Sequence, residues 1–181
     1  MKCWPMTEIT IRDAVTADIP ALHRLIESAY RGEASRAGWT TEADLLDGQR
    51  TDPDDLADIL ADPNQGLLTA WRGHDLVGCV LIADRGEATG YFGMLSISPT
   101  LQGGGLGRRL VEAAHKTMAD RFGAKRVRIS VFPQRETLIA WYQRLGYRLT
   151  GDTLPFPYGN PRFGLPKRDD LYFVVMEREL G

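Results

Sequence analysis

The sequence has too few cysteines for a disulfide framework. Its 181 residues include only Cys3 and Cys79, and neither has the nearby cysteine or histidine ligands that a zinc site requires. We therefore expect reduced thiols and no metal. Long hydrophobic runs are missing too, since no stretch approaches the roughly 20 apolar residues that span a bilayer. With no signal-peptide pattern at the N-terminus, these absences predict a cytoplasmic protein that does not bind a membrane.

An excess of charge of one sign is also missing. The chain has 22 lysines and arginines against 24 acidic residues, a net charge of −2, and a pI near 5.9. Nucleic acids attract strongly basic surfaces, so we expect no nucleic-acid partner. Hydrophobic residues make up 43% and charged residues 25%, as in ordinary globular proteins. The length suits one domain, and we expect residues 1–181 to form it.

The first third of the chain predicts mainly helices after one strand. Residues 8–14 alternate apolar and polar side chains, as a half-buried strand does. Asp18 is positioned to cap a helix with Pro20 in its first turn. A short helix is expected from Thr41 to Gly48, and Pro53 opens another with an acidic first turn.

The remainder predicts a strand meander and two more helices. Residues 66–98 contain three apolar runs separated by turns at 73–75 and near Gly86. Helical spacing follows over 106–122, a strand over 125–132, and a helix from 136 that Gly146 closes. A last strand is expected at 171–179, after a loop rich in proline and glycine at 151–170. The pattern indicates one mixed α+β domain.

Four glycines gather at the start of the helix expected at 106–122, namely Gly103, Gly104, Gly105 and Gly107. A helix N-terminus exposes unpaired N–H groups, and glycines upstream let several of them converge on an anion. The motif therefore predicts a phosphate cradle. The alternative is a tight turn with one positive φ, for which a single glycine would be enough.

Two familiar phosphate loops do not match this segment. A P-loop requires a lysine followed by serine or threonine after its last glycine, whereas Arg108 and Arg109 follow Gly107. A dinucleotide fingerprint G-x-G-x-x-G that begins at Gly103 would need a glycine at position 108. Nucleotide hydrolysis and hydride transfer therefore lose their main support.

Two motifs resemble those of the GNAT superfamily of acetyl-CoA-dependent N-acetyltransferases. The pattern Q/R-x-x-G-x-G/A is met by Gln102, Gly105 and Gly107, after a strand ending in "LSISP". A second family pattern, A-x-x-x-Y-x-x-x-G-F, resembles "LIAWYQRLGY" with Tyr142 in register. The resemblance implies a mostly antiparallel, twisted sheet with helices on both faces and a splayed central strand pair. It also implies acetyl transfer from acetyl-CoA, here to a primary amine of a small molecule or peptide.

The resemblance further implies where the coenzyme binds. The pantetheine arm would pair with the strand at Leu95 and Ile97, and the pyrophosphate would meet the N–H groups of residues 102–108. Arg108 and Arg109 could neutralise phosphate, or form a solvated basic turn. The expected coenzyme-binding residues are Leu95, Ser96, Ile97, Gln102, Gly103, Gly104, Gly105, Leu106, Gly107, Arg108 and Arg109.

For catalysis, the resemblance makes Tyr142 the candidate acid that protonates the coenzyme A thiolate; the alternative is an aromatic on a buried helix face. The base stays open. Tyr91 stands where many family members have glutamate, and Glu27, Glu33 and Glu87 are more typical of solvated carboxylates. A water relay or an amine of low pKa is equally compatible. A second departure is Arg135, where the family often has a cofactor-binding asparagine.

The segments around the cleft should choose the acceptor. Six candidate acceptor contacts are Tyr30, Arg31, Glu33, Trp39, Tyr91 and Tyr158, each with packing or a surface position as its alternative. A homodimer is plausible, since edge strands often pair between chains in this fold. Two other functions stay open: a non-catalytic module that binds acetyl-CoA, and an acyltransferase that uses another acyl-CoA or an oxygen acceptor.

Overall fold

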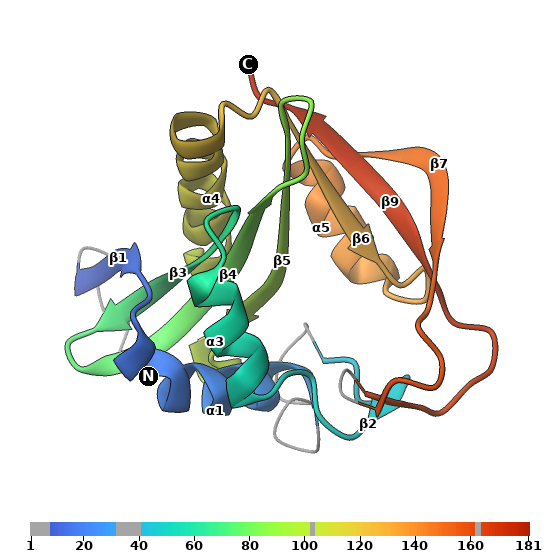
Figure 1. Cartoon of the computed structure of the whole chain (residues 1–181). Coiled ribbons are helices and arrows are strands. Elements are labelled where there is room, and N and C mark those ends of the chain that lie inside the picture. Colours follow the sequence, from blue (N-terminus) through green and yellow to red (C-terminus); the bar gives the residue numbers. More distant parts are fainter. Residues whose placement is uncertain (1–7, 32–40, 102–103, 162–163) are drawn as a thin grey trace.

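The computed structural model describes residues 8–31, 41–101, 104–161 and 164–181. Figure 1 shows the chain as one twisted sheet with helices packed on it. The α-helices are α1 (Ile19–Tyr30), α3 (Pro53–Ala61), α4 (Leu106–Phe122) and α5 (Glu136–Arg144). The strands are β1 (Ile9–Asp13), β2 (Leu46–Asp47), β3 (Gln65–Arg72), β4 (Asp75–Asp84), β5 (Thr89–Ile97), β6 (Arg126–Val131), β7 (Arg148–Pro155), β8 (Leu165–Pro166) and β9 (Tyr172–Glu179).

Seven strands form the main sheet in the order β1-β3-β4-β5-β6-β9-β7, and β2 pairs with β8 in a separate ribbon. All neighbours in the main sheet are antiparallel except β5 and β6. That parallel pair needs a crossover, which α4 supplies. The predicted fold class, a mixed and mostly antiparallel sheet flanked by helices on both faces, is confirmed.

Each face of the sheet has its own apolar core. On one face α1 and α3 pack over β3, β4 and β5, where Leu22, Ile26 and Leu56 are fully buried. On the other face α4 and α5 cover the central strands, with Leu110 and Met118 fully buried. None of the helices in the described part of the chain is long and apolar enough to cross a membrane.

The central strands separate where the sequence resemblance predicts a splay. β5 and β6 pair only from Thr89–Arg126 to Tyr91–Arg128. Beyond that point β5 carries a bulge, because Met94 and Leu95 stand opposite a single β4 residue between the pairs Cys79–Ser96 and Leu81–Gly93. Met94 has a φ of 49°, and such a bulge bends its strand. The bend turns the end of β5 away from β6 and opens the sheet.

Three local predictions are wrong. Residues 43–45 form a turn that leads into β2, instead of a helix, because so short a segment nucleates a helix poorly and β8 offers its backbone a partner. The segment predicted as a loop, 151–170, contains most of β7, whose side chains are almost all exposed, so no alternation marks it. The Asp18 carboxylate accepts hydrogen bonds from the Val15 N–H and from Arg12, not from the α1 backbone.

Candidate active site

A cavity of about 120 Å³ lies at the point where β5 and β6 separate. Its walls come from the exposed edges of both strands, from the end of α1 and from the inner face of α5. The residues around it include Tyr30, Glu42, Arg50, Tyr91, Phe92, Leu95, Ser130, Phe132, Arg135, Tyr142 and Phe173. Because a liquid water molecule occupies about 30 Å³, the cavity has room for only a small chemical group.

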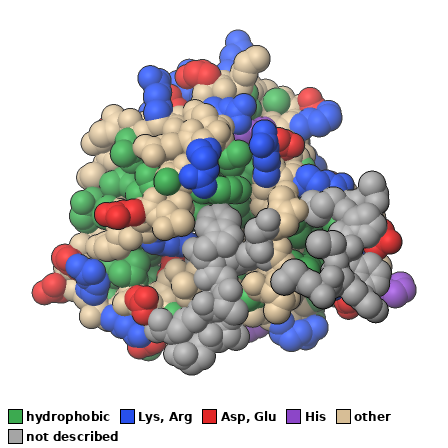
Figure 2. All heavy atoms as spheres, turned by 180° about the vertical axis from the view of Figure 1, so that it is seen from behind, with side chains coloured by type: hydrophobic (Ala, Val, Ile, Leu, Met, Phe, Trp, Pro, Cys, Tyr) green, Lys and Arg blue, Asp and Glu red, His purple; other side chains and the backbone are tan. Residues whose placement is uncertain are grey.

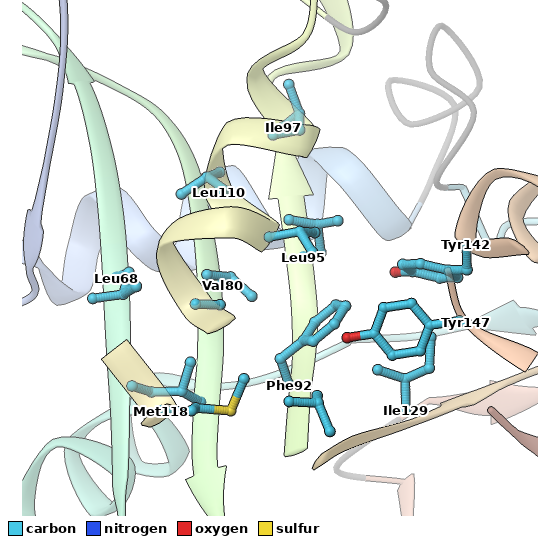
Figure 3. Close-up of a cluster of buried hydrophobic side chains, with 14 of the residues drawn as sticks. Leu68, Val80, Phe92, Leu95, Ile97, Leu110, Met118, Ile129, Tyr142 and Tyr147 are labelled. Atoms are coloured by element: carbon cyan, nitrogen blue, oxygen red, sulfur yellow. The ribbon is translucent and has the colours of Figure 1, made fainter. Parts of the chain in front are cut away.

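Tyr142 enters this cavity from α5. Figure 3 shows its ring extending from α5 toward Leu95 on β5. The ring packs edge-on against Phe92, with 5.8 Å between the ring centroids, and the residue is only 6% exposed. Burial raises the pKa of Tyr142 well above its ordinary value. The hydroxyl therefore keeps its proton. It has no hydrogen-bond partner among the described residues, so the proton is available to a ligand.

The cavity also contains a buried charge cluster that the sequence analysis missed. Arg31 and Glu42 form an ion pair of 2.5 Å, with side chains only 4% and 10% exposed. Arg135 lies 3.5 Å from the second Glu42 oxygen. Burial alone would raise the pKa of Glu42, but the three nearby guanidinium groups of Arg135, Arg31 and Arg50 outweigh it, so the pKa is lowered. A carboxylate held in this way is a weak base.

No local sequence signal could have revealed this cluster, because 93 positions separate Glu42 from Arg135. The sequence marked Arg135 only as a departure from the family pattern. The structure also gives Glu27 a structural role. Its Oε1 accepts hydrogen bonds from the backbone N–H groups of Arg50 and Thr51, at 2.7 and 3.0 Å, so it holds the chain next to the cavity.

Tyr30 has a structural role in addition to lining the cavity. Its hydroxyl donates a hydrogen bond of 2.6 Å to the Leu95 carbonyl, and burial raises its pKa. The Leu95 backbone, which the resemblance assigns to the pantetheine arm, therefore already has a partner for its carbonyl oxygen within the protein. This oxygen has a second lone pair and can still accept a hydrogen bond from a ligand.

The loop before α4 has the geometry of an anion cradle in the part that is described. Gly105 is the N-cap of α4 with a φ of 85°, and a Cβ placed on it would meet nothing within 4 Å. A Cβ on Gly107 would make only an ordinary contact with Trp141 of α5, at 3.5 Å. An open, glycine-lined helix N-terminus suits a phosphate group. Gln102 and Gly103 lie outside the described residues.

The arginines of this loop have partners within the protein. Arg108 is exposed and pairs with Glu112 one turn along α4, and Arg109 donates a hydrogen bond to the Ile9 carbonyl. On the face that carries α4 and α5, Figure 2 shows basic and acidic side chains interspersed. The N–H groups at the start of α4 are therefore the main candidate for anion binding in the described part of the loop.

A larger groove of about 710 Å³ adjoins the small cavity. Tyr91 and Ser130 line both spaces, so the groove is next to the cavity beside Tyr142. Arg85 stacks over the Tyr91 ring, with 4.6 Å from its Cζ to the centroid. Glu87 belongs to the groove wall and lies in a turn with a φ of 53°.

The structure brings only some of the candidate acceptor residues together. Tyr30 and Tyr91 line the cavity. Arg31 lies behind it in the buried ion pair with Glu42. Tyr158 is 44% exposed and bonds the backbone of Arg168 and Leu171, which makes it a loop-packing residue. Glu33 and Trp39 lie outside the described residues.

Two other motif residues have structural roles. Gly146, with a φ of 91°, follows the end of α5 as predicted. Tyr147 contacts the buried His115 at 2.6 Å between its hydroxyl and Nε2. Burial lowers the pKa of His115 to about 4, so the ring is neutral. In the described part of the chain, no group of three or more histidine, cysteine or acidic residues could hold a metal ion.

Comparisons with known proteins agree with this geometry. The profile of the Acetyltransferase (GNAT) family matches residues 21–147. An IAA acetyltransferase of Azospirillum brasilense is 31% identical over 154 residues, which cover 84% of this chain and 87% of the relative. Ard1 from Thermoplasma volcanium is similar in structure, with a TM-score of 0.72, 16% identity and coverage of 96% and 99%.

A second similar structure, yncA from Salmonella typhimurium, was solved with its cofactor acetyl-CoA. It has a TM-score of 0.67 and 21% identity, with coverage of 96% of this chain and 95% of that one. The family profile and the Azospirillum relative together span the splayed strands, the glycine loop and α5. The chain therefore belongs to the GNAT acetyltransferase family and is an acyltransferase.

Proposed function

We propose that this protein transfers the acetyl group of acetyl-CoA directly to a primary amine in a ternary complex, and that Tyr142 protonates the departing thiolate. One observation carries the proposal. The Tyr142 hydroxyl reaches the small cavity between the separated strands and has no hydrogen-bond partner among the described residues. The sulfur of a bound thioester would supply such a partner.

The two substrates would enter from opposite sides of the sheet. The loop at Gly104–Arg109 would hold the pyrophosphate with backbone N–H groups, and the edge of β5 at Leu95–Ile97 would pair with the pantetheine amides. The acceptor amine would come through the groove beside Tyr91. This arrangement places the thioester carbonyl in the cavity, where a backbone N–H of β5 can stabilise negative charge on its oxygen.

Tyr142 both gives up and regains a proton during the reaction. The amine nitrogen forms a bond to the thioester carbon, the carbon–sulfur bond breaks, and the sulfur takes the Tyr142 proton. The amine loses a proton as the amide forms, and this proton restores the tyrosine through water. Glu42 is too well paired to serve as the base, so we propose a water relay from an amine that binds in its neutral form.

The direct test measures coenzyme binding and thiol release separately. Calorimetry with acetyl-CoA should show saturable binding, and free thiol should appear when primary amines are added. Binding without thiol release for any amine would support the non-catalytic module instead. Thiol release that is much faster with a longer acyl-CoA would support an acyltransferase that uses another acyl-CoA.

A further inference from the structure

We propose that the acceptor is an amine that carries a carboxylate next to its amino group, as a free amino acid does, and that Arg135 binds this carboxylate. The inference rests on the proposed function, because it concerns the acceptor of that same reaction. It starts from the charges around the cavity beside Tyr142.

Positive charge exceeds negative charge at this cavity. Arg50, Arg135 and Glu42 line it, and Arg31 lies directly behind, paired with Glu42. Among the described lining residues, two guanidinium groups thus face one carboxylate. Buried charges of one sign are costly unless an opposite charge joins them. An anionic group on the ligand would supply that charge.

Arg135 has donor capacity that the protein leaves unused. Its side chain is only 11% exposed, and its Nη1 lies at the long distance of 3.5 Å from Glu42. Its Nη2 is buried and has no hydrogen-bond partner among the described residues. A guanidinium presents its donors as a planar fork that matches a carboxylate. A ligand carboxylate would satisfy this buried Nη2.

The aromatic walls hold the guanidinium groups in place. Arg135 and Arg50 both face the Tyr30 ring, with 6.0 and 5.4 Å from their Cζ atoms to its centroid. Tyr30 is fixed in turn by its hydrogen bond to Leu95. The cationic ends are therefore preorganised beside the place where the thioester would lie, which lowers the entropy lost on binding.

The sizes of the two spaces fit an amino acid. The cavity of about 120 Å³ can hold a small head group, and the adjoining groove of about 710 Å³ can hold a variable side chain beyond Tyr91. The same arginines repel a protonated amine. A positively charged site favours the neutral form of the amino group, which is the form that attacks, so no dedicated base is needed.

The test compares amino acids with their decarboxylated counterparts. We would use phenylalanine with phenethylamine, and leucine with isopentylamine, and measure both thiol release and calorimetric binding to the protein saturated with coenzyme A. We expect each amino acid to exceed its amine at least tenfold in kcat/KM and in affinity. Equal or better use of the decarboxylated amines would overturn the proposal.

The Arg135→Gln variant tests the assignment to one residue. It should remove most of the amino acid preference, mainly through KM, and leave acetyl-CoA binding within about twofold. Lys116→Gln, on the exposed face of α4, is the control, because it also removes one positive charge. It should change neither the amino acid preference nor the affinity for acetyl-CoA. If Arg135→Gln weakens acetyl-CoA binding and slows all acceptors equally, Arg135 serves the coenzyme and the proposal is wrong.

These outcomes separate this inference from the proposed function. Thiol release with amines that lack a carboxylate, but not with amino acids, would sink the inference and keep the acetyltransferase. If no amine releases thiol, the binding measurement still decides, because amino acids should bind and their decarboxylated counterparts should not.

Discussion

Tyr142 sits in surroundings that oppose its ionisation. Its ring is packed by Phe92, Trp141 and Tyr147, and burial raises its pKa. A tyrosine with a raised pKa is a weak acid toward a thiolate in water. In the same cavity, however, burial also disfavours the thiolate, so the sulfur becomes a stronger proton acceptor as the carbon–sulfur bond breaks.

We predict that Tyr142→Phe lowers kcat by about 10²- to 10⁴-fold, the range usual for general acid catalysis. The affinity for acetyl-CoA should stay within about twofold, since the ring and its packing remain. Tyr172→Phe removes an exposed hydroxyl on β9 and should leave kcat unchanged. A Tyr142→Phe enzyme with full kcat in stopped-flow or steady-state assays would show that Tyr142 only packs the core.

His115 should make folding sensitive to mild acid. Its pKa is about 4 in the folded protein, against 6.5 for the free side chain, so between these values the unfolded chain binds more protons. Stability therefore falls as the pH is lowered from 7 to 4. We expect the free energy of unfolding to fall by about 2 kcal/mol between pH 7 and pH 5, because the unfolded chain binds a proton at His115 and the folded protein does not.

Urea unfolding at both pH values, for the natural protein and for His115→Gln, measures this contribution. The variant loses the hydrogen bond to Tyr147 and should be less stable at pH 7. Its further loss of stability on going to pH 5 should nevertheless be smaller. Identical pH dependence in the two proteins would mean that His115 is already accessible to protons in the folded state.

At the scale of elements, one buried ion pair joins the end of α1 to the segment before β2. Arg31 follows α1 directly, and Glu42 begins the turn that leads to β2. The Glu42 N–H also donates to the Tyr30 carbonyl at 3.0 Å. These contacts fix the wall of the cavity that carries Tyr30.

We predict that Glu42→Gln destabilises the protein by about 3 kcal/mol, because it removes the carboxylate that pairs with the buried guanidinium groups of Arg31 and Arg135. Denaturant unfolding measures the change. The exposed pair of Arg108 with Glu112 offers the control, and Glu112→Gln should have little effect. Equal effects of both substitutions would contradict the role of Glu42 as the buried counter-ion.

Elements whose apolar residues recur at a regular spacing were predictable from the sequence. Elements that form only because a neighbouring segment pairs with them were not. α4 follows from apolar residues at helical spacing, and β3, β4 and β5 from their apolar runs. β7 has exposed side chains and exists because β9 pairs with it. For the candidate site, local motifs pointed to Tyr142 and the glycine loop. The cluster of Arg31, Glu42 and Arg135 forms only when α1, the turn and α5 meet in the fold.

At the scale of the whole molecule, acetyl-CoA should bind across elements that are far apart in the sequence, and so stabilise the fold. A ligand present at 100 times its dissociation constant contributes about 2.7 kcal/mol. For a chain of this size we expect the melting temperature to rise by about 5–10 °C. Glutathione has a thiol and amides but no pyrophosphate, and should give no shift. Equal shifts with both compounds would rule out recognition of the phosphates.

The central claim is that the separation of β5 and β6 exists to admit the thioester of acetyl-CoA beside Tyr142. A crystal structure of the complex tests this most directly. The account predicts the pyrophosphate at the N-terminus of α4 and the coenzyme sulfur within hydrogen-bond distance of the Tyr142 hydroxyl. A coenzyme bound elsewhere, or a cavity still closed by protein side chains in the complex, would contradict it.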